Sequence, residues 1–217
     1  MSEAFDVLIV GAGINGAGLF RDLCEQGLRV AIVDKGDFGS GTSAAPSRLI
    51  HGGLKYLETG EFGLVAQSTL ERNLLLRNAP HLARAVPFVI PSYSWWEGPF
   101  YRIGLGLYDR LSGRWSIGRS RLLSREETIQ HLPTVETAGL RGGVLYYDRQ
   151  FDDARFAIAL AETAVGLGAV LANYCRCTGL LKHHGQVAGA LVRDEETGQQ
   201  FEVRARTVIN ATGVFVD

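Results

Sequence analysis

The sequence predicts an α/β fold built around a parallel sheet that is covered on both faces. Three observations predict it: a continuous apolar run at residues 6–10, a glycine-rich turn directly after it, and a helical pattern leading to a second apolar run at residues 28–33. Uninterrupted apolar strands are typical of parallel sheets with helices on their faces. Strand, helix and strand in this order form one βαβ unit.

The composition is that of an ordinary globular protein and excludes several classes of function. The chain has 217 residues, with 22 Lys and Arg against 23 Asp and Glu, so we expect no nucleic-acid partner. Cys24, Cys175 and Cys177 have the spacing of neither a disulfide framework nor a zinc site, so we expect no metal. The sequence shows no secretory leader and no apolar run of ~18 residues, which predicts a cytoplasmic protein.

The middle of the chain predicts a loop, helices and short strands. Residues 36–47 are rich in Gly, Ser and Thr and predict a loop, whereas 86–90 and 143–148 predict strands. Ser124 with Glu127 forms a capping box that opens a helix. A helix is also predicted at 61–77, with apolar residues spaced for one buried face: Leu64, Val65, Leu70, Leu74 and Leu75.

The last third predicts a return to the first sheet. Asp152 or Asp153 caps a helix at 154–166, and a strand follows at 169–172. Segments 180–182, 187–193 and 200–205 alternate in polarity and predict a β-meander, and 207–210 predicts a separate buried strand. We therefore expect three segments: 1–85 with the βαβ unit and loop, 86–145 as an insertion, and 146–217 as the return.

The glycine-rich turn predicts a dinucleotide site. Gly11, Gly13 and Gly16 form a GxGxxG pattern between a strand and a helix, and Asp34 ends the second strand. These glycines suit a tight turn, close approach to a pyrophosphate, and helix–strand packing, while the acid suits a ribose diol. Asp34 disfavours the 2′-phosphate of NADP, which leaves NAD and FAD. The competing interpretation is a glycine-rich turn with no ligand.

Four stretches resemble one family of flavoproteins. They are residues 6–18, 47–58, 148–155 and 210–213, and the second contains the narrow run Leu-Ile-His-Gly-Gly-Leu. On these residues the chain resembles the N-terminal part of the FAD-dependent glycerol-3-phosphate dehydrogenases, within the D-amino-acid-oxidase-like superfamily. The resemblance covers essentially the whole chain. It implies a Rossmann-like FAD-binding domain with a β-meander and part of a substrate or cap region.

The resemblance implies FAD contacts from five places in the chain. Cys177 lies in the strand whose backbone is expected to meet the adenine, although its side chain also suits a small buried apolar residue. The expected FAD contacts are Gly11, Gly13, Ile14, Asn15, Gly16, Asp34, Lys35, Thr42, Ser43, Ser47, Arg48, Leu49, His51, Gly52, Gly53, Cys177, Ala211, Thr212 and Gly213.

Three residues are implied to act in catalysis: His51, Lys55 and Tyr56. His51 either orients the flavin or removes a hydroxyl proton, and a structural hydrogen bond is an equal alternative. Lys55 stands where the family has an arginine, and a lysine binds phosphate as a point charge rather than with a planar fork. An ordinary surface lysine is the alternative.

The implied reaction oxidises sn-glycerol 3-phosphate to dihydroxyacetone phosphate, with electrons passed to a quinone or, in oxidase variants, to oxygen. Members of the family are longer, and we expect this chain to lack their later segment. Two alternatives stay open: an FAD-binding fragment without activity alone, and a related flavin oxidoreductase acting on a 2-hydroxy acid or an amino acid. A homodimer is one assembly to be expected.

A quinone partner implies a membrane surface, and one segment suits it. Aromatic residues gather between Tyr93 and Trp115, and six arginines lie between residues 97 and 125. This composition is typical of an interfacial helix on anionic lipid, at the inner face of the cell membrane. The spacing of Phe100, Ile103, Leu107 and Leu111 also suits a core-facing helix, so both interpretations stay open.

Overall fold

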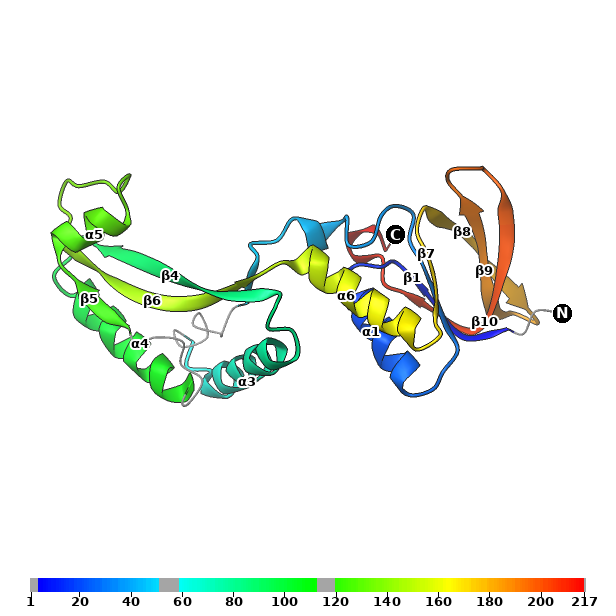
Figure 1. The fold of residues 1–217 in the computed structure, drawn as a ribbon, viewed down its shortest axis with the longest axis horizontal. Coiled ribbons are helices and arrows are strands. Elements are labelled where there is room, and N and C mark those ends of the chain that lie inside the picture. Colours follow the sequence, from blue (N-terminus) through cyan, green and yellow to red (C-terminus); the bar gives the residue numbers. More distant parts are fainter. Residues whose placement is uncertain (1–3, 51–58, 113–119, 217) are drawn as a thin grey trace. The chain divides into compact units, whose positions relative to one another are not determined.

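A computed structural model describes residues 4–50, 59–112 and 120–216. The chain divides into two compact units. The first unit combines Met1–Ser47 with Asp152–Asp217, and the second is Arg48–Phe151 (Figure 1).

The first unit is a sheet flanked by two helices. In the described residues its strand order is β7-β2-β1-β10-β9-β8, with β1, β2 and β7 mutually parallel and β10 parallel to β1. Its elements are β1 (Phe5–Val10), α1 (Ile14–Glu25), β2 (Val30–Val33), the 3-10 turn η1 (Thr42–Ala44), α6 (Asp153–Gly166), β7 (Val170–Ala172), β8 (Cys175–His183), β9 (Gln186–Asp194), β10 (Gln200–Asn210) and η3 (Gly213–Phe215). This arrangement confirms the predicted α/β class.

Alternating side chains of the central strands build two cores. Ile9 and Ile32 face α1 and α6, which pack side by side, and they bury Phe20 completely (Figure 1). Leu8 and Val33 face the other way and pack under the meander against Val192. Because successive strand residues point to opposite faces, a continuous apolar run is what two covered faces require.

Strand β10 corrects one prediction. Residues 200–205 and 207–210 do not form two strands but one, which pairs antiparallel with β9 and then parallel with β1. At Gly189, φ is +142° and a Cβ would lie 2.9 Å from the Cα of Arg204, so the two chains approach closely there. One long strand therefore serves both the meander and the parallel sheet.

The second unit is an antiparallel sheet with helices. Its elements are β3 (Leu49–Ile50), α3 (Phe62–Asn78), β4 (Ala83–Ser92), α4 (Glu97–Ser112), β5 (Arg121–Leu123), α5 (Arg125–His131) and β6 (Gly142–Phe151). Strand β6 pairs with β3, β4 and β5. The predicted capping box is confirmed, since Ser124 and Glu127 exchange side chain to backbone hydrogen bonds at the start of α5. No helix in the described ranges is long and apolar enough to cross a membrane.

The buried face of α3 differs from the predicted one. Val65 is buried as expected, but Leu70 is 54% exposed, and Leu64 and Leu74 are also exposed. The buried side chains are instead Val65, Thr69, Arg72 and Asn73. This buried face includes an ion pair, since Arg72 Nη1 lies 3.3 Å from Asp148 Oδ1 on β6.

Candidate dinucleotide site

The glycine turn after β1 has the geometry that its sequence predicts. Gly11 has φ +105°, and a Cβ there would lie 2.6 Å from the carbonyl oxygen of Ala211. A Cβ on Gly16 would overlap the carbonyl oxygen of Gly11. Larger residues would therefore separate α1 from the turn, and the N-terminus of α1 lies next to the ends of β1 and β10 because glycines stand here.

Asp34 holds this turn to the end of β2. Its Oδ2 accepts a hydrogen bond from the Ala12 N–H at 2.7 Å, and its Oδ1 accepts one from the Gly36 N–H at 3.0 Å. The second bond is the local turn that aspartate makes two residues ahead. One carboxylate thus connects the glycine turn with the loop that follows β2.

Ser43 caps α1 from a distant loop. Its Oγ accepts the Ile14 N–H at 2.9 Å, and a Cβ on Gly13 would lie 3.3 Å from the same oxygen. Thr42 and Ser43 belong to η1, and the Ser43 hydroxyl lies at the helix N-terminus. Unpaired N–H groups and the dipole make such a terminus favourable for negative charge.

The chain returns to the site after β10. The Ala211 N–H donates to the Val10 carbonyl at 2.8 Å, and Asn210 Oδ1 accepts from both the N–H and the hydroxyl of Thr212. Lys35 Nζ lies 3.8 Å from the centre of the Phe215 ring. The residues after β2 and after β10 are therefore in contact with each other beside the glycine turn.

The beginning of β8 lies next to the end of β2. The Cys175 N–H donates to the Asp34 carbonyl at 2.7 Å, and the Tyr174 N–H donates to the Gly36 carbonyl. Cys177 packs against the core beneath the meander, opposite Val192. On this strand, burial raises the pKa of the Cys175 thiol.

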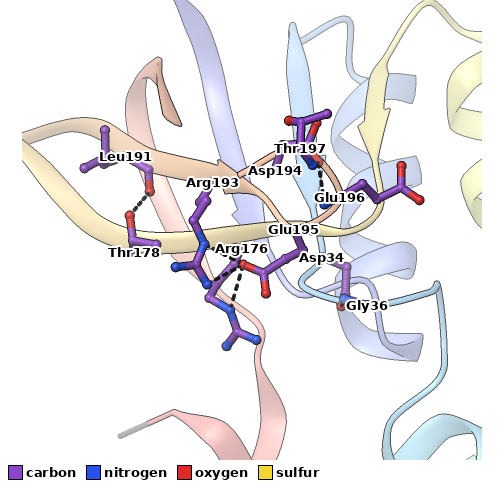
Figure 2. Close-up of polar contacts among 10 residues, drawn as sticks. All are labelled: Asp34, Gly36, Arg176, Thr178, Leu191, Arg193, Asp194, Glu195, Glu196 and Thr197. Atoms are coloured by element: carbon purple, nitrogen blue, oxygen red, sulfur yellow. Dashed lines mark hydrogen bonds and ion pairs between the residues drawn. The ribbon is translucent and has the colours of Figure 1, made fainter. Parts of the chain in front are cut away.

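Glu195 bridges two arginines on the meander. Its Oε1 lies 3.2 Å from Arg176 Nε and 2.7 Å from an Nη of Arg193, as Figure 2 shows. The Arg193 guanidinium holds the pKa of Glu195 below its ordinary value. Arg176 and Arg193 stand opposite each other in the β8–β9 register, and the carboxylate offsets their repulsion.

Within the first unit, most of the residues predicted to bind the cofactor lie around the glycine turn, and the others lie elsewhere. Asn15 is exposed on the first turn of α1, and Ser47 ends the first segment of this unit. Arg48 and Leu49 belong to the second unit, where the Arg48 carbonyl accepts from the Phe151 N–H. The predicted residues that lie outside the described ranges are His51, Gly52, Gly53, Lys55 and Tyr56.

Three residues of the site were missed in the sequence. Ala12 and Gly36 bind Asp34 through backbone N–H groups, and Phe215 contacts Lys35 through its ring. The Asp-x-Gly spacing of Asp34 and Gly36 is a turn signal that could have found one of them. The backbone N–H of Ala12 and the ring contact of Phe215 correspond to no sequence motif that would have predicted them.

These features fit a pyrophosphate cofactor. The glycines let the turn pack closely against α1 and the end of β10, the N-terminus of α1 stands at this turn, and an acid stands at the end of the neighbouring strand. Together with the meander, they define a dinucleotide-binding domain of the flavoprotein type. The chain belongs to the family of FAD dependent oxidoreductases, whose profile matches residues 6–217.

Known proteins extend this similarity to the whole chain. Glycerol-3-phosphate dehydrogenase of Mycobacterium leprae is 42% identical over 100% of this chain and 37% of its own length. The mitochondrial glycerol-3-phosphate dehydrogenase of Macaca fascicularis is 41% identical over 100% of this chain and 32% of its own. A structure of the Bacillus halodurans glycerol-3-phosphate dehydrogenase complexed with FAD is 26% identical, with TM-score 0.74 over 97% of this chain and 34% of that one. The chain thus spans about a third of the length of these relatives.

Proposed function

We propose that this chain binds FAD and forms the N-terminal part of an enzyme that oxidises sn-glycerol 3-phosphate to dihydroxyacetone phosphate. One observation carries the proposal: two glycerol-3-phosphate dehydrogenases align with the whole chain at 41–42% identity, and the glycine cradle that the site needs is intact. The whole reaction belongs to a longer protein in these relatives, so the activity of this chain is part of the proposal.

The first unit provides the binding groups for the dinucleotide. Gly11, Gly13 and Gly16 allow the backbone to approach the pyrophosphate, and the N-terminus of α1 faces its charge. Asp34 accepts two backbone N–H groups, and a carboxylate has about four lone-pair positions, so it retains capacity for a ribose hydroxyl. The Ser43 hydroxyl, whose oxygen accepts the Ile14 N–H, still has its own hydrogen to donate to a phosphate oxygen.

The remaining predicted roles complete the proposal. FAD, when bound, supplies the acceptor for a hydride. His51 would remove the hydroxyl proton or orient the cofactor, while Lys55 and Tyr56 would hold the substrate. The flavin would be lined by Arg48 and Leu49, and its ring would lie beside the backbone of Gly52 and Gly53.

The finer part of the proposal is a quinone acceptor at a membrane surface, reached from the cytoplasm. In the part of α4 whose side chains are described, Phe100 is 56% exposed and Ile103 is 74% exposed. Trp95, which lies just before this helix, is 76% exposed. Trp96 and Phe100 contact each other edge to face. These exposures support the interfacial interpretation of the segment, because Trp95, Phe100 and Ile103 are presented to solvent, although Leu105 of the same helix is buried. A homodimer remains part of the same proposal.

The spectrum of the purified chain with FAD tests the proposal. The chain is incubated with FAD, desalted, and mixed without oxygen with sn-glycerol 3-phosphate, a 2-hydroxy acid, or an amino acid. We expect a retained flavin band that bleaches only with glycerol 3-phosphate. Bleaching with another substrate would favour a related oxidoreductase, and a bound flavin that stays yellow would indicate an FAD-binding part without activity alone. Absence of bound flavin would contradict the proposal.

A further inference from the structure

The outer edge of strand β10 is paired along only part of its length. Strand β9 pairs with β10 from Gln200 to Arg204 and leaves it at Gly189, where φ is +142°. Beyond that point β9 continues to pair with β8 alone. Residues 206–210, which we call the open edge, therefore have β1 on one side and no strand on the other among the residues that the structure describes.

The backbone groups of the open edge alternate between β1 and the unpaired side. The Ala211 N–H donates to the Val10 carbonyl, so the odd-numbered residues of this stretch direct their N–H and C=O groups toward β1. The even-numbered residues direct theirs away from β1: Arg206, Val208 and Asn210. Within the described ranges, no backbone hydrogen bond joins these outward groups to another segment. Each of these residues thus offers one N–H donor and one carbonyl acceptor at the open edge.

The side chains of the open edge are those of an interior strand. Val208 packs against the core beneath the meander, and Ile209 packs against the opposite core, which contains Phe20. Both are only half-buried, whereas their register partners on β1, Leu8 and Ile9, are fully buried. Apolar residues on both faces are typical of a strand in the middle of a sheet. A neighbour on the open side would give Val208 and Ile209 the surroundings that β1 already has.

The two ends of the sheet are protected against pairing, and the open edge is not. Strand β7 is only three residues long, and β8 has two register shifts and carries Lys182. Short strands, bulges and lysines are features that prevent an edge from pairing with another chain. Residues 207–210 contain no proline or lysine, and their register with β1 has no shift. This edge is therefore suited to accept a strand.

We propose that the open edge binds one further β-strand and that the rest of a longer polypeptide supplies it. An exposed sheet edge recognises an extended segment through its main-chain hydrogen bonds, as in β-augmentation. The outward groups of Arg206, Val208 and Asn210 would pair with this strand, which would cover β10 directly before the Ala211 turn of the candidate dinucleotide site.

The length of the open edge favours a segment of the same polypeptide over a second copy of this chain. An edge this short buries far less than the roughly 1,200 Å² of a stable interface between separate proteins. A tethered segment needs no such area, because the connection holds it at a high effective concentration. The glycerol-3-phosphate dehydrogenases that match this chain have most of their length outside the match. The inference rests on the proposed function only in taking this chain as part of a longer enzyme.

Hydrogen exchange of this chain, alone and with a complementary polypeptide, tests the inference without an enzyme assay. The complementary polypeptide is the part of the Mycobacterium leprae glycerol-3-phosphate dehydrogenase that does not align with this chain, and the two are co-expressed. In the chain alone, we expect the amides of Arg206, Val208 and Asn210 to exchange freely, while β1 protects those of Thr207 and Ile209. In the complex, the first three amides should exchange at least about tenfold more slowly.

A proline at the open edge provides a second test. Val208→Pro removes one outward N–H and leaves the backbone groups that face β1 in place, so it should weaken the complex at least about tenfold. Val208→Thr is the matched control, because threonine keeps the N–H and the branched shape of valine, and it should bind like the wild type. Circular dichroism reports whether each variant folds. If the proline variant does not fold, the exchange rates of the wild type decide.

Each other outcome contradicts a stated part of the inference. Protection of the three outward amides in the dilute chain alone would show that the edge is already paired and would overturn it. Absence of a complex, or a complex that leaves these amides unprotected, would also overturn it. Protection that grows with the concentration of the chain alone, together with a dimer in sedimentation, would show that a second copy is the occupant.

The same samples separate this inference from the proposed function. Protected edge amides in a complex that retains no FAD would support the inference and count against the proposed function. Retained FAD that is bleached by sn-glycerol 3-phosphate, in a complex whose outward amides stay unprotected, would support the proposed function and overturn the inference.

Discussion

The side chain of Asp34 accepts a hydrogen bond from the backbone of Ala12, with 2.7 Å between Oδ2 and the nitrogen. These residues are 22 positions apart and belong to the end of β2 and to the glycine turn. Because the other carboxylate oxygen accepts the Gly36 N–H, one side chain fixes two loops of the site. The residue expected to bind a ribose is thus also the residue that shapes the turn.

Substitution of Asp34 is expected to weaken both the fold and cofactor binding. Asp34→Ala leaves two half-buried backbone N–H groups without their acceptor, which costs about 1–3 kcal/mol of unfolding free energy. Urea unfolding and FAD titration measure the two effects. Asp22→Ala, an exposed acid on α1 that pairs with Arg21, is the control and should change neither. Unchanged FAD affinity in Asp34→Ala would contradict the predicted role.

Two glycines of α1 should respond in opposite ways to the same substitution. A Cβ on Gly16 overlaps the Gly11 carbonyl, so Gly16→Ala should cost about 1–3 kcal/mol and reduce FAD retention. Nothing lies within 4 Å of a Cβ on Gly18, where alanine should stabilise the helix by roughly 0.5–1 kcal/mol. Thermal unfolding with and without FAD compares them. Equal effects at both positions would show that the turn is not closely packed.

The buried pair on α3 and β6 should be sensitive to removal of one charge. Asp148→Asn leaves the buried Arg72 without its carboxylate, and we expect a loss of about 3–5 kcal/mol in unfolding free energy. The double variant Arg72→Met with Asp148→Leu should recover much of that loss, because apolar residues often replace buried pairs at little cost. Asp37→Asn, at an exposed position, is the control. A mild effect of Asp148→Asn in urea unfolding would refute the prediction.

Glu97 should make stability depend on acidic pH. Its Oε2 accepts the N–H groups of Tyr93 and Ser94, and these bonds hold the pKa of Glu97 below its ordinary value. A carboxyl group whose pKa is lowered in the folded state stabilises the fold when the pH is above its ordinary pKa. This stabilisation is lost as the pH falls through the lowered pKa. Glu97→Gln should therefore be less stable than wild type at neutral pH, with a difference that disappears in acid. Glu71→Gln, which removes the same charge from an exposed position of α3, is the control for urea unfolding across pH.

The exposed tryptophans before α4 should control membrane binding. Replacing Trp95 and Trp96 by alanine removes two side chains, each worth about 1.5–3 kcal/mol when buried in lipid, so flotation with anionic liposomes should fall more than tenfold. Phe201→Ala, which removes an exposed aromatic from β10, is the control. Binding of the wild type should also weaken with added salt. Unaltered flotation of the double variant would exclude this surface.

Elements with strong local signals were predicted well. The capping box of Ser124 is present, and of the two acids offered for α6, Asp152 is the cap, with Oδ1 accepting the Arg155 N–H. The predicted meander is present, and its strands β8 and β9 are joined by a turn at His184 and Gly185, which both have positive φ. Each of these depends on residues only a few positions apart, so the sequence contains the whole interaction.

Elements that depend on distant partners were predicted less well. The apolar spacing of α3 indicated a leucine face, but the buried face contains Arg72, which pairs with Asp148, 76 residues away. Strand β10 was divided in two because its polarity pattern changes where its neighbour changes from β9 to β1. The polarity pattern of a segment indicates how buried its residues are on average. It does not identify the strand or side chain against which the segment packs.

The sequence by itself determined the βαβ unit, the glycine turn with its acid, and the meander, because hydrophobic period and the absence of a Cβ act locally. Only the tertiary structure decided that Asp34 binds Ala12 and that Ser43 caps Ile14. It also decided that Lys35 contacts Phe215 and that Arg72 pairs with Asp148. These contacts join residues from different strands and loops. They depend on the order and register of the strands, which are established only when the chain folds.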